Sequence, residues 1–328
     1  MEKDLKRPLV SIVLPVYNCS NFISDSIGSL LVQSYENIEI IVVDDFSTDT
    51  TVDHILLFND NRIKLFKNKS NLGISQTLNF GIKQCIGKYI ARMDGDDVAH
   101  KDRILKQVNF LELNNDIAIC GTGYKILNGN GVFQPKLSYS EIIMQLSLDC
   151  PFAHPTIMAR NNVFIENQYA KEFEPCEDLE LWTRLIPKYK VANLKDQLLF
   201  YRVHSQQIST KSSSLQLELS KNVIESYIYE ISNKNKFYKF FSTSPLLCEK
   251  DYLKYKSVEN SIIKYWNEKG VELGEDLLLK RMKNYLRINF WSQVNLHDID
   301  FFKLRFFINR IGFYLTFKTL LKKVLYHS

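Results

Sequence analysis

The chain has 328 residues, of which 45% are hydrophobic and 24% charged, and its formal net charge is +5. This length allows one large domain or two smaller ones, and the composition is that of a globular core and not of a disordered chain. The net positive charge comes from residues 301–328, which contain Lys and Arg but no Asp or Glu. The rest of the chain is mildly acidic, which argues against a nucleic-acid-binding protein.

The N-terminal segments predict a strand–helix–strand unit. The apolar run 10–16 predicts a buried strand, and residues 22–33 have apolar side chains at helical spacing. The β-branched run 38–43 predicts a second buried strand, which ends in Asp44 and Asp45. This order predicts an α/β fold with a mostly parallel, doubly wound sheet flanked by helices.

A second acidic strand end follows further along the chain. We expect a short strand at 63–66, a helix at 75–85 and a strand at 89–93 that runs directly into Asp94, Asp96 and Asp97. Ligands bind at strand ends in such sheets, and clustered carboxylates suit Mg²⁺ or Mn²⁺. The alternative is an acidic turn in which Asp97 caps a helix that starts near Lys101.

Two nucleotide-binding motifs are missing from the sequence. There is no Gly-x-Gly-x-x-Gly after the first strand and no Gly-x-x-x-x-Gly-Lys-Ser/Thr anywhere. A dinucleotide-dependent dehydrogenase and a P-loop nucleotidase are therefore not expected.

The C-terminal third predicts a helical region. After a strand over 197–203, the polar segment 205–214 marks a domain boundary, and helices are expected at 215–232, 253–269 and 275–291. We therefore predict a catalytic domain over 1–210 and a helical region over 211–328. The six cysteines show no zinc-binding spacing, so we expect reduced thiols in a cytoplasmic protein.

The basic tail has the pattern of an amphipathic helix. Aromatic and aliphatic side chains recur at helical spacing across 301–328, with Lys and Arg between them. Such a helix can lie on the anionic inner-membrane surface, or it can pack on its own domain or on a partner chain. No apolar run reaches the ~20 residues of a membrane span, and the run 10–16 is too short for a signal peptide.

Seven segments, in order, resemble the family 2 glycosyltransferases, which have the Rossmann-like GT-A fold. They cover the first ~205 residues and are VSIVLPVYN (10–18), IEIIVVDDFSTDTT (38–51), NLGISQTLNFGI (71–82), GKYIARMDGDD (87–97), HPTIMAR (154–160), EDLELWTRL (177–185) and YRVHSQQIS (201–209). The pattern is similar to bacterial enzymes that extend lipopolysaccharide, capsule or other surface glycans.

The resemblance implies an activity. Such enzymes move a sugar, as a hexosyl or N-acetylhexosaminyl group, from a nucleotide-sugar donor, usually a UDP-sugar, to a hydroxyl of a glycan or lipid-linked acceptor, with inversion at the anomeric carbon. The reaction needs a site for the base, a divalent metal for the diphosphate and a general base for the acceptor. It would place the protein at the cytoplasmic face of the membrane.

The resemblance also implies the residues at the nucleotide. Tyr17 would pack against uracil, or else close the edge of the sheet. Asp44, or with slightly less preference Asp45, would accept the uracil N3–H, and the other carboxylate would hold the turn. The remaining expected donor contacts are Pro15, Asn18, Asn71, Gly73, Gly95 and Arg202, where Arg202 would pair with phosphate or with a site carboxylate.

The metal ligands and catalytic groups follow from the same likeness. Asp96 would bind Mn²⁺ or Mg²⁺ directly, and Asp94 would contact the metal or the ribose. His204 would be a third ligand to the metal or touch the diphosphate, and Gly95 would leave room for the ligand. Asp178 would be the general base, with Glu177 as the second choice, although acids are also favoured at a helix N-terminus. Trp182 would contact the acceptor or pack in the core. His154 would lie on the acceptor side, as a catalytic residue or in a structural role at a strand edge.

Two other functions stay open. A sugar nucleotidyltransferase has a similar sheet, but its Gly-rich basic loop is not found after the first strand, where the sequence reads PVYNCSNF. A non-catalytic scaffold of a glycan assembly complex would keep nucleotide binding without turnover, and the intact acidic motifs argue against it.

Overall fold

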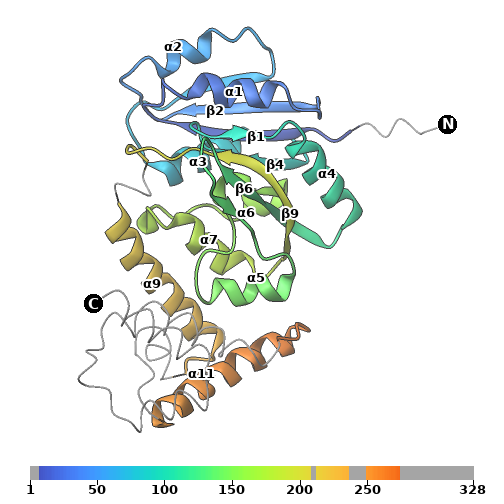
Figure 1. Cartoon of the computed structure of the whole chain (residues 1–328), viewed down its shortest axis with the longest axis vertical. Coiled ribbons are helices and arrows are strands. Elements are labelled where there is room, and N and C mark those ends of the chain that lie inside the picture. Colours follow the sequence, from blue (N-terminus) through green and yellow to red (C-terminus); the bar gives the residue numbers. More distant parts are fainter. Residues whose placement is uncertain (1–6, 208–211, 236–248, 274–328) are drawn as a thin grey trace, which may run out of the picture. The chain divides into compact units, whose positions relative to one another are not determined.

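The computed structural model describes residues 7–207, 212–235 and 249–273 (Figure 1). The division between two compact units falls inside α9 (Ser213–Ile231), between Val223 and Ile224. The boundary predicted near residue 210 precedes this division and stays a prediction.

Four parallel strands build the first half of the sheet. Their order is β3-β2-β1-β4, and each runs in the same direction as its neighbour. The strands are β1 (Val10–Val16), β2 (Ile38–Asp44), β3 (Ile63–Lys67) and β4 (Tyr89–Arg92). Both β1 and β2 are buried along their whole length, as expected for strands covered on both faces.

Helices cover both faces of β1 and β2. Successive side chains of each strand point to opposite faces, so alternate residues pack against different helices. On one face Ile12 and Ile40 pack in the same core cluster as Ile27 of α1 (Ile23–Leu31). On the other face Gly81 of α3 (Ile74–Lys83) lies so close to Val13 that a Cβ would come within 2.7 Å of it. The short α2 (Thr51–Leu56) packs beside α1 (Figure 1).

The second half of the sheet is mixed. It continues in the order β4-β8-β6-β9-β5, where β6 and β9 are parallel and the other pairings are antiparallel. The α/β prediction is confirmed, and parallel pairing dominates its first half. The added strands are β5 (Val98–Ala99), β6 (Ile117–Ile126), β8 (Met158–Arg160) and β9 (Lys190–Tyr201), and β7 (Val132–Phe133) pairs with β6.

Helical segments connect these strands. They are α4 (Arg103–Leu113), α5 (Tyr139–Leu146), α6 (Asn161–Glu166), α7 (Glu177–Leu185) and the 3₁₀ turns η1 (His154–Thr156) and η2 (Lys171–Phe173). The expectation that Asp97 caps the helix after it is wrong. The N-cap residue of α4 is Asp102, and the Asp97 carboxylate instead accepts the Arg202 N–H at 2.9 Å.

The second unit contains the end of α9 and α11 (Glu249–Glu268). Its buried side chains include Ile228, Val258, Ile262 and Trp266. The predicted helices at 215–232 and 253–269 are confirmed, whereas the helix predicted at 275–291 and the basic tail 301–328 lie outside the described residues. Within the described ranges, no helix has the length and hydropathy needed to span a membrane.

Candidate active site

The carboxyl ends of β1, β2 and β4 open into a cavity of about 640 Å³. Most residues predicted for the site line it, although they come from segments far apart in the sequence. They are Pro15, Tyr17, Asn18, Asp45, Asn71, Gly73, Asp94, Gly95, Asp96, His154, Glu177, Asp178 and His204. Asp44, Arg202 and Trp182 are not part of this lining.

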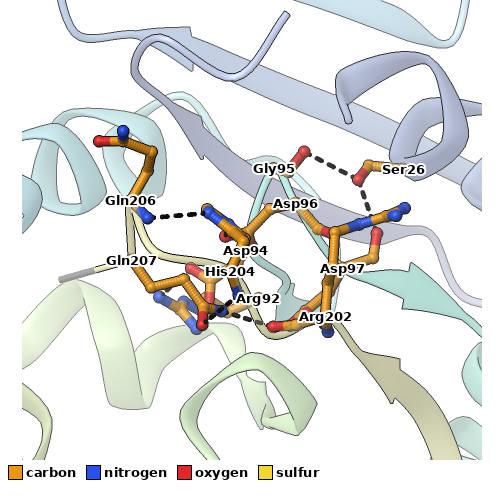
Figure 2. A network of polar contacts seen from close by, with 10 residues as sticks. All are labelled: Ser26, Arg92, Asp94, Gly95, Asp96, Asp97, Arg202, His204, Gln206 and Gln207. Atoms are coloured by element: carbon orange, nitrogen blue, oxygen red, sulfur yellow. Dashed lines mark hydrogen bonds and ion pairs between the residues drawn. The ribbon is translucent and has the colours of Figure 1, made fainter. Parts of the chain in front are cut away.

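The acidic loop after β4 is held from two sides (Figure 2). The Ser26 hydroxyl of α1 donates to the carbonyls of Gly95 at 2.8 Å and Asp97 at 2.6 Å. From the end of β9, the Arg202 Nε donates to the Asp96 carbonyl at 2.8 Å. These bonds fix the backbone of the loop and therefore the positions from which its carboxylates project.

The reason for glycine at position 95 differs from the expected one. A Cβ on Gly95 would lie 2.9 Å from Val16 Cγ1 and 3.2 Å from Cys19 Sγ. The missing side chain therefore lets the loop pack on the end of β1, and the expectation that it makes room for a ligand is not needed to explain it.

The loop gathers a set of ligands that suits a divalent cation. Carboxylate oxygens of Asp94, Asp96 and Asp97 lie within 4.8 Å of one another. The Asp97 Oδ2 is buried and has no hydrogen-bond partner, and burial raises the pKa of Asp97 well above its usual value. His204 Nε2 lies 2.9 Å from Asp96 Oδ2 (Figure 2). Three hard oxygen ligands and an imidazole fit Mn²⁺ or Mg²⁺.

Arg92 is the buried counter-charge of this cluster. Its guanidinium forms two bonds to Asp94, Nη2 to Oδ1 at 2.5 Å and Nη1 to Oδ2 at 2.8 Å. Burial raises the pKa of Asp94 to about 6, although Arg92 opposes this rise. Among the described residues, Arg92 is the one Lys or Arg that lines the cavity, against the carboxylates of Asp45, Asp94, Asp96, Glu177 and Asp178.

The Arg202 side chain lies outside the cavity lining and contacts the acidic loop and α1. Its guanidinium donates to Asp25 at 2.9 Å and stacks over Phe22, with 4.9 Å between Cζ and the ring centroid. Together with the bond from Arg202 Nε to the Asp96 carbonyl, these contacts hold the Arg202 side chain against the acidic loop. The expected contact of Arg202 with phosphate stays a prediction, and its bond to a site carboxylate is made by the backbone N–H, which donates to Asp97.

At the nucleotide end, the preference for Asp44 is not supported. Asp44 is 3% exposed, and its carboxylate accepts the Ser47 N–H at 3.3 Å, which closes the turn after β2. Asp45 lines the cavity instead, and it accepts the N–H groups of Leu72 at 2.9 Å and Gly73 at 3.0 Å.

Tyr17 offers a ring to a ligand, because it is 50% exposed at the cavity. Asn18 next to it has φ +47°, and its amide oxygen accepts the Thr48 N–H at 2.8 Å. The Asn18 side chain therefore joins the loops after β1 and β2, next to the exposed ring of Tyr17.

Glu177 and Asp178 lie on the cavity wall at the first turn of α7. Burial and the neighbouring Asp178 raise the pKa of Glu177 to about 8, and its Oε2 has no hydrogen-bond partner. Burial also raises the pKa of Asp178, but the Leu179 N–H at 2.7 Å and the Cys150 thiol at 3.4 Å donate to its carboxylate. Near neutral pH, Asp178 is thus the better proton acceptor of the two.

Comparison with known proteins agrees with this geometry. The sequence profile of "Glycosyl transferase family 2" matches residues 11–168. A protein named as an uncharacterized glycosyltransferase of Haemophilus influenzae is 33% identical over 69% of this chain and 75% of its own length. The chain belongs to glycosyl transferase family 2.

This glycosyltransferase is also similar to further named relatives and to a solved structure. The O-antigen biosynthesis glycosyltransferase WbnJ of Escherichia coli is 33% identical over 63% of this chain and 84% of its own. Other matched relatives are longer, and the chain spans 33% of the length of two of them. The structure of S. aureus TarS 1–349 with UDP-GlcNAc has 19% identity and a TM-score of 0.59 over 87% of this chain and 91% of its own, which confirms the GT-A fold.

Of the two alternatives for Trp182 in this transferase, the structure supports packing in the core. The indole is 0% exposed, and its ring centroid lies 5.2 Å from that of Phe152 and 6.1 Å from that of His154. A ring enclosed in this way cannot stack on an acceptor sugar. His154 does line the cavity, but its Nε2 is paired with the Tyr169 hydroxyl at 2.8 Å and burial lowers its pKa well below the usual value, so the ring is neutral.

Two residues at the site were not expected from the sequence. Cys150, a thiol next to Asp178, is 28 residues away from it and follows no local pattern. Gln207 joins the turn after β9, donating to the Arg202 carbonyl at 2.5 Å and accepting the His204 N–H at 3.2 Å. The sequence feature that could have indicated Gln207 is its position inside the segment YRVHSQQIS. The five described cysteines are free thiols, as predicted.

Proposed function

We propose that this family 2 glycosyltransferase is a metal-dependent, inverting enzyme that moves a sugar from a UDP-sugar to a hydroxyl of a glycan or lipid-linked glycan. The observation that carries the proposal is the arrangement of the cavity. The metal-ligating set Asp94, Asp96 and His204 shares it with the candidate base Asp178, and Tyr17 is exposed at the same cavity. One space thus offers groups for a diphosphate, an attacking hydroxyl and a base.

The charge balance of the cavity supports metal dependence. Arg92, the one described Lys or Arg of its lining, is already paired with Asp94. A diphosphate carries two or more negative charges, and an acidic cavity would repel it without added cations. Asp94, Asp96 and His204 would hold Mn²⁺ or Mg²⁺, which when bound neutralises the charge that develops on the leaving diphosphate. Asp97 is available to the same ion through its unpartnered Oδ2.

The protein groups then divide the reaction between them. Asp178 takes the proton of the acceptor hydroxyl while the oxygen attacks the anomeric carbon of the sugar. The bond from that carbon to the diphosphate oxygen breaks, and UDP leaves from the opposite face of the sugar. An α-linked UDP donor would therefore give a β-linked product, and ¹H NMR of the product measures this directly. Glu177, protonated near neutral pH, offers a hydrogen-bond donor to the bound substrate and does not take the proton.

The biological setting is inferred from the likeness to WbnJ, whose name assigns it to O-antigen biosynthesis. We infer that the acceptor is a growing surface glycan and that the protein works at the cytoplasmic face of the membrane. The amphipathic pattern of residues 301–328 supports contact with that surface. Sedimentation of the full chain with vesicles of anionic lipid tests this: binding that requires anionic lipid supports it, and no binding at low salt contradicts it.

Calorimetry with UDP, with and without Mn²⁺, tests the donor and metal assignments. The expected result is Mn²⁺-dependent binding that Asp96→Ala abolishes and that Asp102→Ala, outside the cavity, leaves intact. UDP release is then screened with UDP-glucose, UDP-galactose and their N-acetyl forms. Without a glycan acceptor, the reaction measured is the slow transfer of the sugar to water. Binding without any turnover, also with added glycan acceptors, would favour the scaffold. Binding that ignores both Mn²⁺ and Asp96 would contradict the metal site.

A further inference from the structure

The segment that leads into α7 is attached to α3 by the side chain of Asn79. The Asn79 Nδ2 donates to the Tyr169 carbonyl at 2.8 Å, and its Oδ1 accepts the Tyr169 N–H at 2.9 Å. One amide side chain therefore satisfies both backbone groups of a residue 90 positions away, much as a neighbouring strand would. Asn79 therefore has a structural contact that joins α3 to this segment.

Glu174 forms a second attachment at the N-terminus of α3. Its Oε1 accepts the Ser75 N–H at 2.7 Å. Ser75 lies in the first turn of α3, where N–H groups have no partner within the helix. The helix dipole also favours a carboxylate at this end. The bond thus satisfies a group that the helix itself leaves unpaired.

The fit of Glu174 to α3 is close on both of its oxygens. Gly73 has φ +91°, and a Cβ built on it would lie 2.5 Å from Glu174 Oε2. The second carboxylate oxygen therefore occupies the space that any side chain at position 73 would need. Glycine at this position serves the contact with Glu174 as well as the left-handed backbone.

Two carboxylates therefore hold the loop before α3 from different parts of the fold. Asp45, at the end of β2, takes the N–H groups of Leu72 and Gly73, and Glu174 takes that of Ser75. Both attached segments line the cavity, through Gly73 on one side and through Pro175 and Asp178 on the other. Glu174 itself is not among the lining residues, so it would act through its neighbours.

We propose that Glu174 is a positioning residue, whose carboxylate ties the turn before α7 to α3 and so sets the distance between Asp178 and a donor bound along residues 71–77. This inference rests on the proposed function. Misplacing a base by about 1 Å can cost ~100-fold in rate. The donor side of the loop stays attached through Asp45, so loss of Glu174 should lower kcat and leave nucleotide binding nearly unchanged.

The test compares Glu174→Ala and Glu174→Gln with the wild type, using the UDP-sugar that the wild type turns over fastest. Glu174→Ala should lower kcat for UDP release about 10- to 100-fold, with the Kd for UDP in Mn²⁺ within about threefold of wild type. Glu174→Gln should recover most of the rate, because an amide oxygen can still accept the Ser75 N–H. Glu172→Ala, an exposed acid of the same segment, is the matched control and should behave like wild type.

Three results would overturn the proposal: an unchanged kcat in Glu174→Ala, a Kd for UDP that weakens as much as kcat falls, or a Glu174→Gln variant as slow as Glu174→Ala. If Glu174→Ala does not fold, Glu174→Asp replaces it, since its shorter carboxylate should show the same separation of kcat from Kd. A wild type that binds UDP but turns over no UDP-sugar refutes the proposed function, whereas an active wild type with an unaffected Glu174→Ala refutes this inference alone.

Discussion

His204 Nε2 lies 2.9 Å from Asp96 Oδ2, although the two residues are 108 positions apart in the sequence. Asp96 follows β4 and His204 follows β9, strands that are not neighbours in the sheet. The contact exists because Arg202, two residues before His204, bonds to the Asp96 carbonyl and the Asp97 carboxylate. The proposed metal-ligating set is therefore assembled by the fold and not by a local motif.

Replacing His204 should weaken metal-dependent nucleotide binding. We expect His204→Asn to raise the concentration of Mn²⁺ needed for half-maximal UDP binding about 10- to 100-fold, as for the loss of a group that holds or orients a metal. Calorimetry at several Mn²⁺ concentrations measures this. His100→Asn serves as the control, because His100 is not part of the cavity lining. Equal behaviour of the two variants would remove His204 from the metal site.

The two acids of α7 should respond differently to removal of their charge. Asp178→Asn should lower kcat for UDP release ~10²- to 10⁴-fold, because the amide cannot accept a proton. Glu177→Gln should stay within ~10-fold of wild type, because Glu177 is already neutral at pH 7 with a pKa of about 8. Steady-state rates at pH 7 with Mn²⁺ decide between them, and the reverse order would make Glu177 the base.

The sequence was sufficient for the strand ends, and the reason is physical. A β-branched run followed by acids predicts a buried strand and its terminus from local information alone, as at Val43 and Asp44. The choice between Asp44 and Asp45 was not predictable, because successive side chains of a strand point to opposite faces and the turn decides which one reaches the cavity.

The role of Trp182 was beyond the sequence for a related reason. Helical spacing places Trp182 on the same side of α7 as Asp178, but it does not say how far that side extends into the core. In the fold, the first turn of α7 reaches the cavity and the next turn packs on Phe152. Cys150 and Glu174 act through contacts with distant segments, and such contacts leave no periodic pattern in one sequence.

Glu177 should also make stability depend on pH. Its pKa rises from 4.5 to about 8 on folding, so between these values the folded state holds a proton that the unfolded state releases. Stability should therefore fall as the pH rises from 4.5 to 8 and change little from this group above 8. Glu177→Gln should gain about 1–3 kcal/mol over wild type at pH 8 and less at pH 5. Urea unfolding at both pH values measures the difference, with Glu172→Gln as the exposed control. A gain that is equal at both pH values would contradict the assignment.

A side chain at position 73 should damage the fold at the loop before α3. Gly73→Ala must adopt φ +91° and place its Cβ 2.5 Å from Glu174 Oε2, so either the loop shifts or the bond to Ser75 breaks. We expect a loss of about 1–3 kcal/mol in the free energy of unfolding, typical of a strained left-handed residue. Gly28→Ala is the matched control, because a Cβ on Gly28 meets nothing within 4 Å and alanine is the better helix former. Unfolding in urea should therefore show Gly73→Ala destabilised and Gly28→Ala unchanged or stabilised.

The double variant Gly73→Ala with Glu174→Ala separates the two causes, since removing the carboxylate relieves the clash but not the strain. If the loss in the free energy of unfolding of the double variant is at least the sum of the two single losses, Glu174 does not occupy the space beside Gly73.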